Sequence, residues 1–133
     1  MPEDAALRAV VYCLDERRTG AFYAALAGLH LVESSDDVAT FAARHVRLSF
    51  VRVPDHVAAA YPLADPPERR SDNPVKLVLP VASLAAARAA APALGGSVGT
   101  QDAEWDWADG RHVDAVDPEG NVVDLCEPAQ DRS

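Results

Sequence analysis

The most informative stretch of the sequence is Asp117-Pro118-Glu119-Gly120-Asn121-Val122-Val123-Asp124-Leu125. Pro118 fixes φ at a value suited to a turn, while Gly120 and Asn121 tolerate the positive φ that tight turns need. Runs rich in Val precede and follow this turn, at residues 111–116 and 122–127. The stretch therefore predicts a β-hairpin at the end of the last sheet of the chain.

Upstream of this hairpin, the sequence gives the same order of elements twice. Residues 8–14 are typical of a strand, Asp15 is suited to an N-cap, and a helical stripe follows at Phe22, Ala25, Leu26 and Leu29. The second copy has a strand-like run at 75–81, then Ser83 as the cap, and a stripe at Leu84, Ala87, Ala91 and Leu94. A shift of 68 positions places Val10 on Val78 and Gly28 on Gly96, which indicates an internal repeat.

Prolines separate the two copies. Five of the ten prolines fall between Pro54 and Pro74, beside a charged run that has nothing to bury. Short strands are expected after each helix, at 38–43 and 45–53 in the first copy and within the hairpin in the second. We therefore expect one α+β domain over residues 1–133, built of two βαβββ modules at about 8–53 and 75–128, with a linker at 54–74.

Composition restricts the classes of partner. Twelve basic and 21 acidic residues give a net charge of −9 and a pI near 4.7, so the surface repels phosphate backbones and nucleic acid is not expected. No apolar run approaches the ~20 residues of a membrane span, and the acidic start lacks the basic region of a signal peptide. Two cysteines, Cys13 and Cys126, fit a reducing compartment. We expect a cytoplasmic protein that contacts no membrane.

The sequence resembles the vicinal-oxygen-chelate superfamily, which includes glyoxalase I, bleomycin-resistance proteins and extradiol dioxygenases. The resemblance rests on the closing stretch 117–125 and on Asp15 with Phe22-Tyr23 and Leu26-Ala27-Gly28. It covers nearly the whole chain apart from the termini and the linker. It implies two modules whose curled sheets surround a cavity, and a homodimer.

The resemblance also implies where a metal would bind in the enzymes of this superfamily. Carried onto this sequence, the four ligand positions fall on Arg8, Arg47, Lys76 and Asp124. Arg offers no lone pair and Lys is protonated, so we expect no metal and no other cofactor. A slip in the strand register would place Ser49 or His45 at the second position and reopen the question.

Two interpretations of these four residues remain open. They form a cationic pocket floor that holds a carboxylate, phosphate or enolate, with Asp124 orienting a base, or they form a buried ion-pair network that binds nothing. A further alternative places Arg8 and Lys76 at strand ends, where their charged groups reach solvent.

The segment 102–109 holds both tryptophans of the chain and four carboxylates. On a strand, Trp105 and Trp107 point to the same face, where they are suited either to a flat cationic or aromatic ligand or to packing against a helix or partner. His112 lies two positions before Asp114, a spacing that could orient an imidazole as a base. Tyr12 alternates with Arg8 and is expected to line the same cavity.

Three functional hypotheses follow. The first is a metal-free protein, similar to the bleomycin-resistance group, that sequesters a small molecule in the cavity between the modules or across the dimer. Its candidate binding residues are Arg8, Tyr12, Arg47, Lys76, Trp105, Trp107, His112 and Asp124. The second is an isomerase or lyase in which Arg8, Lys76 and Asp124 take the place of the metal. The sequence does not identify the residues that would carry out the catalytic step. The third is a non-catalytic module whose dimer surface matters. The expected partners are a small molecule and a second copy of the chain.

Overall fold

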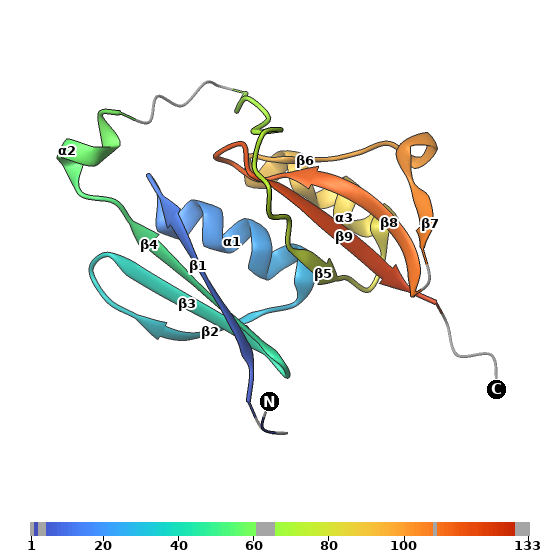
Figure 1. Cartoon of the computed structure of the whole chain (residues 1–133), viewed down its shortest axis with the longest axis horizontal. Coiled ribbons are helices and arrows are strands. Elements are labelled where there is room, and N and C mark those ends of the chain that lie inside the picture. The colour runs from blue at the N-terminus through green and yellow to red at the C-terminus, as the bar shows by residue number, and fades with distance from the viewer. Residues whose placement is uncertain (1, 3–4, 61–65, 108, 130–133) are drawn as a thin grey trace.

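The computed structural model describes residues 2, 5–60, 66–107 and 109–129. Its first half is a four-stranded sheet with one long helix, and its second half is a five-stranded sheet with a shorter helix (Figure 1). The first half contains β1 (Leu7–Cys13), α1 (Glu16–Ala27), β2 (His30–Ser34), β3 (Val38–Ala43), β4 (Val46–Arg52) and the short α2 (Asp55–Ala58). The second half contains β5 (Val78–Pro80), α3 (Leu84–Ala90), η1 (Ala91–Leu94), β6 (Ser97–Val98), η2 (Gln101–Ala103), β7 (Trp105–Trp107), β8 (Gly110–Val116) and β9 (Val122–Pro128).

Both sheets have the same topology. The strand order is β1-β4-β3-β2 in the first sheet and β5-β9-β8-β6 in the second, where β7 also pairs with β8. In each sheet the first and last strands of the half pair in parallel, and the neighbouring pairs are antiparallel. This arrangement confirms the predicted α+β class with two curled sheets.

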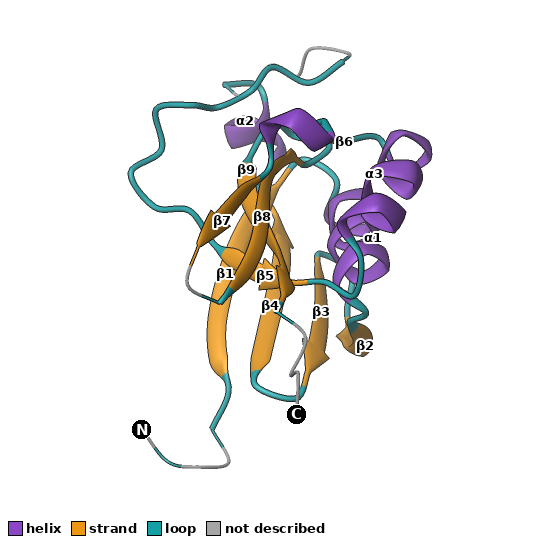
Figure 2. Ribbon diagram, turned by 90° about the vertical axis from the view of Figure 1, so that its right-hand side faces the viewer, coloured by secondary structure: helices purple, strands orange, loops and turns teal. Residues whose placement is uncertain are grey.

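The helices α1 and α3 lie together on one side of both sheets (Figure 2). The side chain of Asp15 accepts a hydrogen bond from the Arg18 amide, so it caps α1 as predicted, and Gly28 ends the helix with a φ of +68°. Phe22 and Leu26 on α1 pack with Phe50 in the core, which continues to Val113 and Leu125 of the second sheet. The opposite side of the sheets, here called the helix-free face, carries the residues that alternate with this core.

Several elements differ from the sequence prediction. The second helix stops at Ala90 and continues as a 3-10 turn, because Pro92 lacks the amide hydrogen that an α-helix needs. β5 covers only Val78–Pro80 of the expected 75–81. The strands β2, β6 and β7 were not predicted individually, and α2 lies within the proline-rich segment, starting directly after Pro54.

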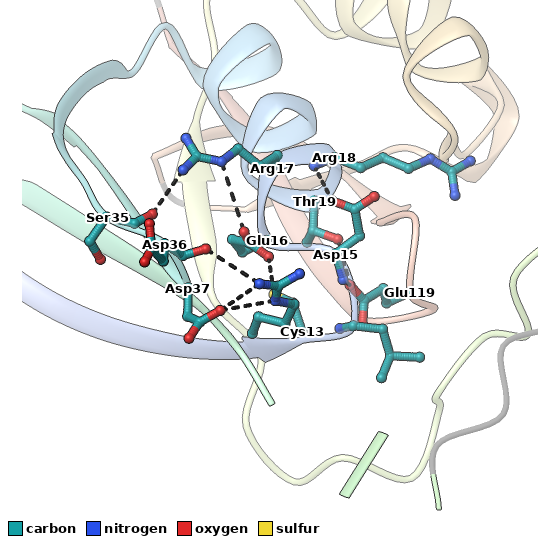
Figure 3. Close-up of polar contacts among 12 residues, drawn as sticks. Cys13, Asp15, Glu16, Arg17, Arg18, Thr19, Ser35, Asp36, Asp37 and Glu119 are labelled. Carbon is teal, nitrogen blue, oxygen red and sulfur yellow. Dashed lines mark hydrogen bonds and ion pairs between the residues drawn. The ribbon is translucent and has the colours of Figure 1, made fainter. Parts of the chain in front are cut away.

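Two buried carboxylates of the closing turn, Asp117 and Glu119, join the two halves. Asp117 accepts a hydrogen bond from the hydroxyl of Tyr23 on α1 at 2.8 Å. Glu119, in the turn before β9, accepts hydrogen bonds from the amides of Leu14 and Asp15 at 2.7 and 3.1 Å and from the Thr19 hydroxyl at 2.9 Å. Figure 3 shows Glu119 beside Asp15 and Thr19 at the start of α1. The closing turn thus provides an acceptor for hydrogen-bond donors at the start of the helix in the other half.

Among the described residues, no helix has the length and apolar character required to cross a membrane.

Candidate functional site

Strand register gathers several predicted site residues on the helix-free face of the second sheet. His112 on β8 lies opposite Trp105 on β7 and opposite Cys126 on β9. Asp124 lies opposite Asp114, two residues further along the same face. Because the neighbouring Val113 and Leu125 point into the core, these polar side chains face away from the helices.

His112 lies between two carboxylates. Its Nδ1 is 2.8 Å from Oδ1 of Asp124, and its Nε2 is 2.9 Å from Oδ1 of Asp109. The imidazole is 0% exposed and Asp124 is 2% exposed, whereas the side chain of Asp109 is 68% exposed. Burial opposes the charged imidazolium, but the hydrogen bonds to Asp109 and Asp124 outweigh burial and raise the pKa of His112. The hydrogen bond to His112 lowers the pKa of Asp109.

Both tryptophans lie against this histidine. The Trp105 ring is stacked on His112 with centroids 5.5 Å apart and planes 19° apart, and the Trp107 ring lies 5.2 Å away at 48°. Trp107 is 59% exposed. The Lys76 ammonium lies 5.6 Å from the centre of the Trp105 ring, within the range of a cation–π contact. The three rings form a platform that is partly open to solvent.

Asp114 does not orient His112, as the spacing had suggested. Instead it binds Lys76 Nζ at 2.9 Å and Arg69 at 3.0 Å. The spacing did place the side chains of His112 and Asp114 on one face. However, the strand order brings two basic residues to Asp114: Lys76, which precedes β5, and Arg69, from the segment before it. Two of the cations near the platform are therefore neutralised in part by one carboxylate.

The remaining candidates lie on the first sheet. Arg8 on β1 and Arg47 on β4 are register partners, and Tyr12 on the same face is 69% exposed. Tyr12 borders a small cavity of about 60 Å³ that is also lined by Arg70 and Glu119. Within the described part of the chain, no hydrogen bond or ion pair connects Arg8, Tyr12 or Arg47 to the histidine group.

The residues present do not fit the metal site that the superfamily implies. Arg8 and Arg47 offer no lone pair, Lys76 donates to Asp114, and Asp124 is held by His112. A different set does offer donor atoms: ligand atoms of Asp109, His112 and Cys126 all lie within 4.8 Å of one another. Sequence reasoning counted Asp109 among the carboxylates of the segment 102–109 but related neither Asp109 nor Cys126 to His112. The signal for Cys126 was the hairpin pairing that places it opposite His112.

Comparison with protein families identifies one match over most of the chain. A family described as "Glyoxalase-like domain" matches residues 8–126. No curated protein matches the sequence significantly.

Solved structures share the fold at low sequence identity. A glyoxalase/bleomycin resistance protein/dioxygenase family enzyme from Burkholderia phytofirmans PsJN superposes with a TM-score of 0.65 at 17% identity, over 92% of this chain and 97% of that one. The antibiotic binding protein TnmS3 from Streptomyces sp. CB03234 gives 0.58 at 20% identity, over 93% and 95%. A bleomycin-binding protein from Streptomyces verticillus, complexed with copper(II)-bleomycin, gives 0.55 at 17% identity, over 97% and 100%. These similarities establish the fold.

Proposed function

The chain belongs to the family of glyoxalase-like domains, and from this premise we propose that it binds a small planar aromatic molecule on the helix-free face, without the metal ligands usual in enzymes of the fold. The ligand stacks on the exposed ring of Trp107 beside Trp105, and the buried His112 supports these two rings. The chain acts by sequestering this molecule rather than by converting it.

The exposed Trp107 is the observation that carries the proposal. An indole that is 59% exposed leaves apolar surface in water, next to the Trp105 ring that is stacked on His112. A planar ligand that covers this surface gains both apolar burial and stacking. The exposed carboxylate of Asp109 at the edge of the platform favours a ligand with a cationic substituent.

Two structural neighbours support a binding role by analogy. One is an antibiotic binding protein, and the other was solved with copper(II)-bleomycin. At these identities the analogy concerns the fold, so the argument for this chain rests on its own aromatic platform.

The proposal includes a homodimer in the cytoplasm. β1 is an edge strand of the first sheet, and its helix-free face exposes Val10 at 56% and Tyr12 at 69%. A second copy that covers this edge removes both side chains from water. The two cysteines are free and buried, as suits a reducing compartment. Sedimentation velocity tests the dimer, and a monomer at micromolar concentration contradicts it.

The enzymatic alternative finds less support in the geometry. It requires Arg8, Lys76 and Asp124 to act together on a substrate. However, Lys76 is bound to Asp114, Asp124 is bound to the buried His112, and Arg8 lies on the other sheet. Unchanged ligand after prolonged incubation with the protein distinguishes sequestration from turnover.

Tryptophan fluorescence tests the proposal directly, because both tryptophans of the chain belong to the platform. We expect planar aromatic compounds in a ligand panel to quench this emission and to raise the melting temperature. A ligand at 100 times its Kd stabilises the native state by about 2.7 kcal/mol. Trp107→Ala is expected to weaken binding by about tenfold, in line with the ~1 kcal/mol of an aromatic pair plus lost burial.

Leu31→Ala provides the matched control. Leu31 is 53% exposed on β2, in the first sheet, so its removal changes a similar exposed apolar surface away from the platform. It is expected to leave the affinity unchanged. The proposal is wrong if no planar compound in the panel binds, or if Trp107→Ala binds as tightly as the wild type.

A further inference from the structure

The surroundings of His112 pose a problem of proton balance. A neutral imidazole carries one N–H, so it donates to only one of two carboxylates. Here Asp124 faces Nδ1 and Asp109 faces Nε2, each within hydrogen-bond distance. With the proton on Nδ1, the Nε2 lone pair points at a carboxylate. This contact is repulsive unless a positive charge lies between them, either a second proton or a metal ion.

Cys126 supplies a third donor at the same point. It lies opposite His112 in the β8–β9 register, and its thiol is close enough that the Asp109, His112 and Cys126 ligand atoms are all within 4.8 Å of one another. Zn–N distances of 2.0–2.1 Å and Zn–S distances near 2.3 Å imply ligand separations of roughly 3.3–3.6 Å in a tetrahedral site. Because every separation is at most 4.8 Å, side-chain rotations that change each of them by no more than about 1.5 Å give this spacing.

We propose that Asp109, His112 and Cys126 bind one zinc ion, and that Asp124 orients His112 for it. The fourth position is left to water. A thiolate, an imidazole and a carboxylate together suit zinc, whereas calcium and magnesium prefer oxygen donors alone. The site differs from the ligand positions carried over from the superfamily, since three of those positions hold Arg8, Arg47 and Lys76.

The surroundings of the site favour a divalent cation. Asp124 is buried and hydrogen-bonded to Nδ1, which holds the proton there and turns the Nε2 lone pair toward Asp109, as is usual where a carboxylate supports a histidine ligand. When zinc binds, the Cys126 thiol releases its proton to solvent, and Zn²⁺ with one thiolate, one carboxylate and a neutral imidazole is then electrically neutral beside the buried Asp124. The stacked Trp105 covers the face of the imidazole and holds the ring in place.

Cobalt(II) is the probe for this site, because its bond to a thiolate absorbs in the near ultraviolet. The full chain is stripped with a chelator, dialysed and titrated with Co²⁺, and then with Zn²⁺. We expect a thiolate-to-cobalt band that saturates at one equivalent and disappears as Zn²⁺ displaces the cobalt. Absence of the band at saturating Co²⁺ overturns the proposal and leaves His112 as an imidazolium between two carboxylates.

Two pairs of variants locate the site. Cys126→Ala is expected to abolish the band, whereas Cys13→Ala, which removes the other free and buried cysteine, is expected to retain it. Asp109→Ala is expected to weaken Zn²⁺ binding at least about tenfold, because even the loss of a residue that only hydrogen-bonds to a metal ligand weakens binding by that factor. Asp106→Ala is its control, because Asp106 is 85% exposed on the same hairpin and pairs with Arg111.

The exposed Asp109 keeps the test decisive if Cys126→Ala does not fold, since its side chain is 68% exposed. Wild-type affinity for Zn²⁺ in Asp109→Ala contradicts the assigned ligand set. So does a cobalt band that is lost in Cys13→Ala and kept in Cys126→Ala.

Discussion

Glu119→Ala tests how much the buried carboxylate of Glu119 contributes to the contact between the two halves of the protein. Glu119 is 5% exposed and accepts three hydrogen bonds, from the amides of Leu14 and Asp15 and from the hydroxyl of Thr19. A hydrogen bond to a charged group contributes about 1.5–3 kcal/mol, and a buried donor left without a partner costs about 1–3 kcal/mol. The substitution leaves three donors at the start of α1 without this acceptor.

The loss is smaller than the sum of three such terms. A cavity of about 60 Å³ borders Glu119 and Leu14 and has room for water, which restores part of the hydrogen bonding. We therefore expect Glu119→Ala to lower the free energy of unfolding by about 3–5 kcal/mol. The turn itself survives, because the amide of residue 119 still donates to Asp117 at 2.8 Å.

Urea denaturation followed by far-ultraviolet circular dichroism measures this loss. Glu119→Gln retains one acceptor oxygen and is expected to lose about half as much, and Thr19→Val about 1 kcal/mol. Coupling between the Glu119 and Thr19 substitutions in a double-mutant cycle reports their direct contact. Glu33→Ala, on the exposed β2, is the control and is expected to change stability by less than about 0.5 kcal/mol. A loss below about 1 kcal/mol in Glu119→Ala refutes the reasoning.

Three further outcomes are expected from urea denaturation of single variants. Gly96→Ala places a Cβ 2.4 Å from the Val116 carbonyl oxygen and lowers stability by about 1–3 kcal/mol, and an unchanged midpoint contradicts it. Phe50→Ala empties a fully buried ring position and lowers stability by about 3–5 kcal/mol, and a loss under about 1 kcal/mol contradicts that packing. The hydrogen bond from Arg88 lowers the pKa of Glu104, so this pair stabilises the fold above the ordinary carboxyl pKa and loses that contribution as pH falls through the lowered value. Glu104→Gln is therefore less stable than the wild type at pH 7 and closer to it at pH 3, and a pH-independent difference contradicts this account.

The fold was largely predictable because its signals are local. The turn at 117–121 and the cap at Asp15 involve residues adjacent in sequence, and the structure contains both. The stripe that contains Phe22 and Leu26 lies in the core as expected. Predictions were less accurate where a strand is defined by its pairing with a distant segment. An example is the two-residue strand β6, which is too short to show a periodicity of its own.

The candidate site depends on pairing between strands, and this explains what the sequence could not indicate. Alternation along β7 and β8 placed Trp105, Trp107 and His112 on a common face, where they are found together. Alternation along one strand does not predict the hydrogen-bond partners of His112. Asp124 is a diagonal neighbour on β9, and Asp109 comes from the turn before β8. Without the register of three strands, no spacing in the sequence relates these residues.

The parallel pairing of first and last strands has a consequence for biosynthesis. The sheet of the first half is complete once β4 has been synthesised, but the donors at the start of α1 await Glu119, more than 100 residues after Leu14. The second sheet in turn requires β9, which pairs with β5. In a nascent chain the first half therefore lacks its hydrogen bonds to Glu119 until the final hairpin emerges. Contacts this distant in sequence slow folding.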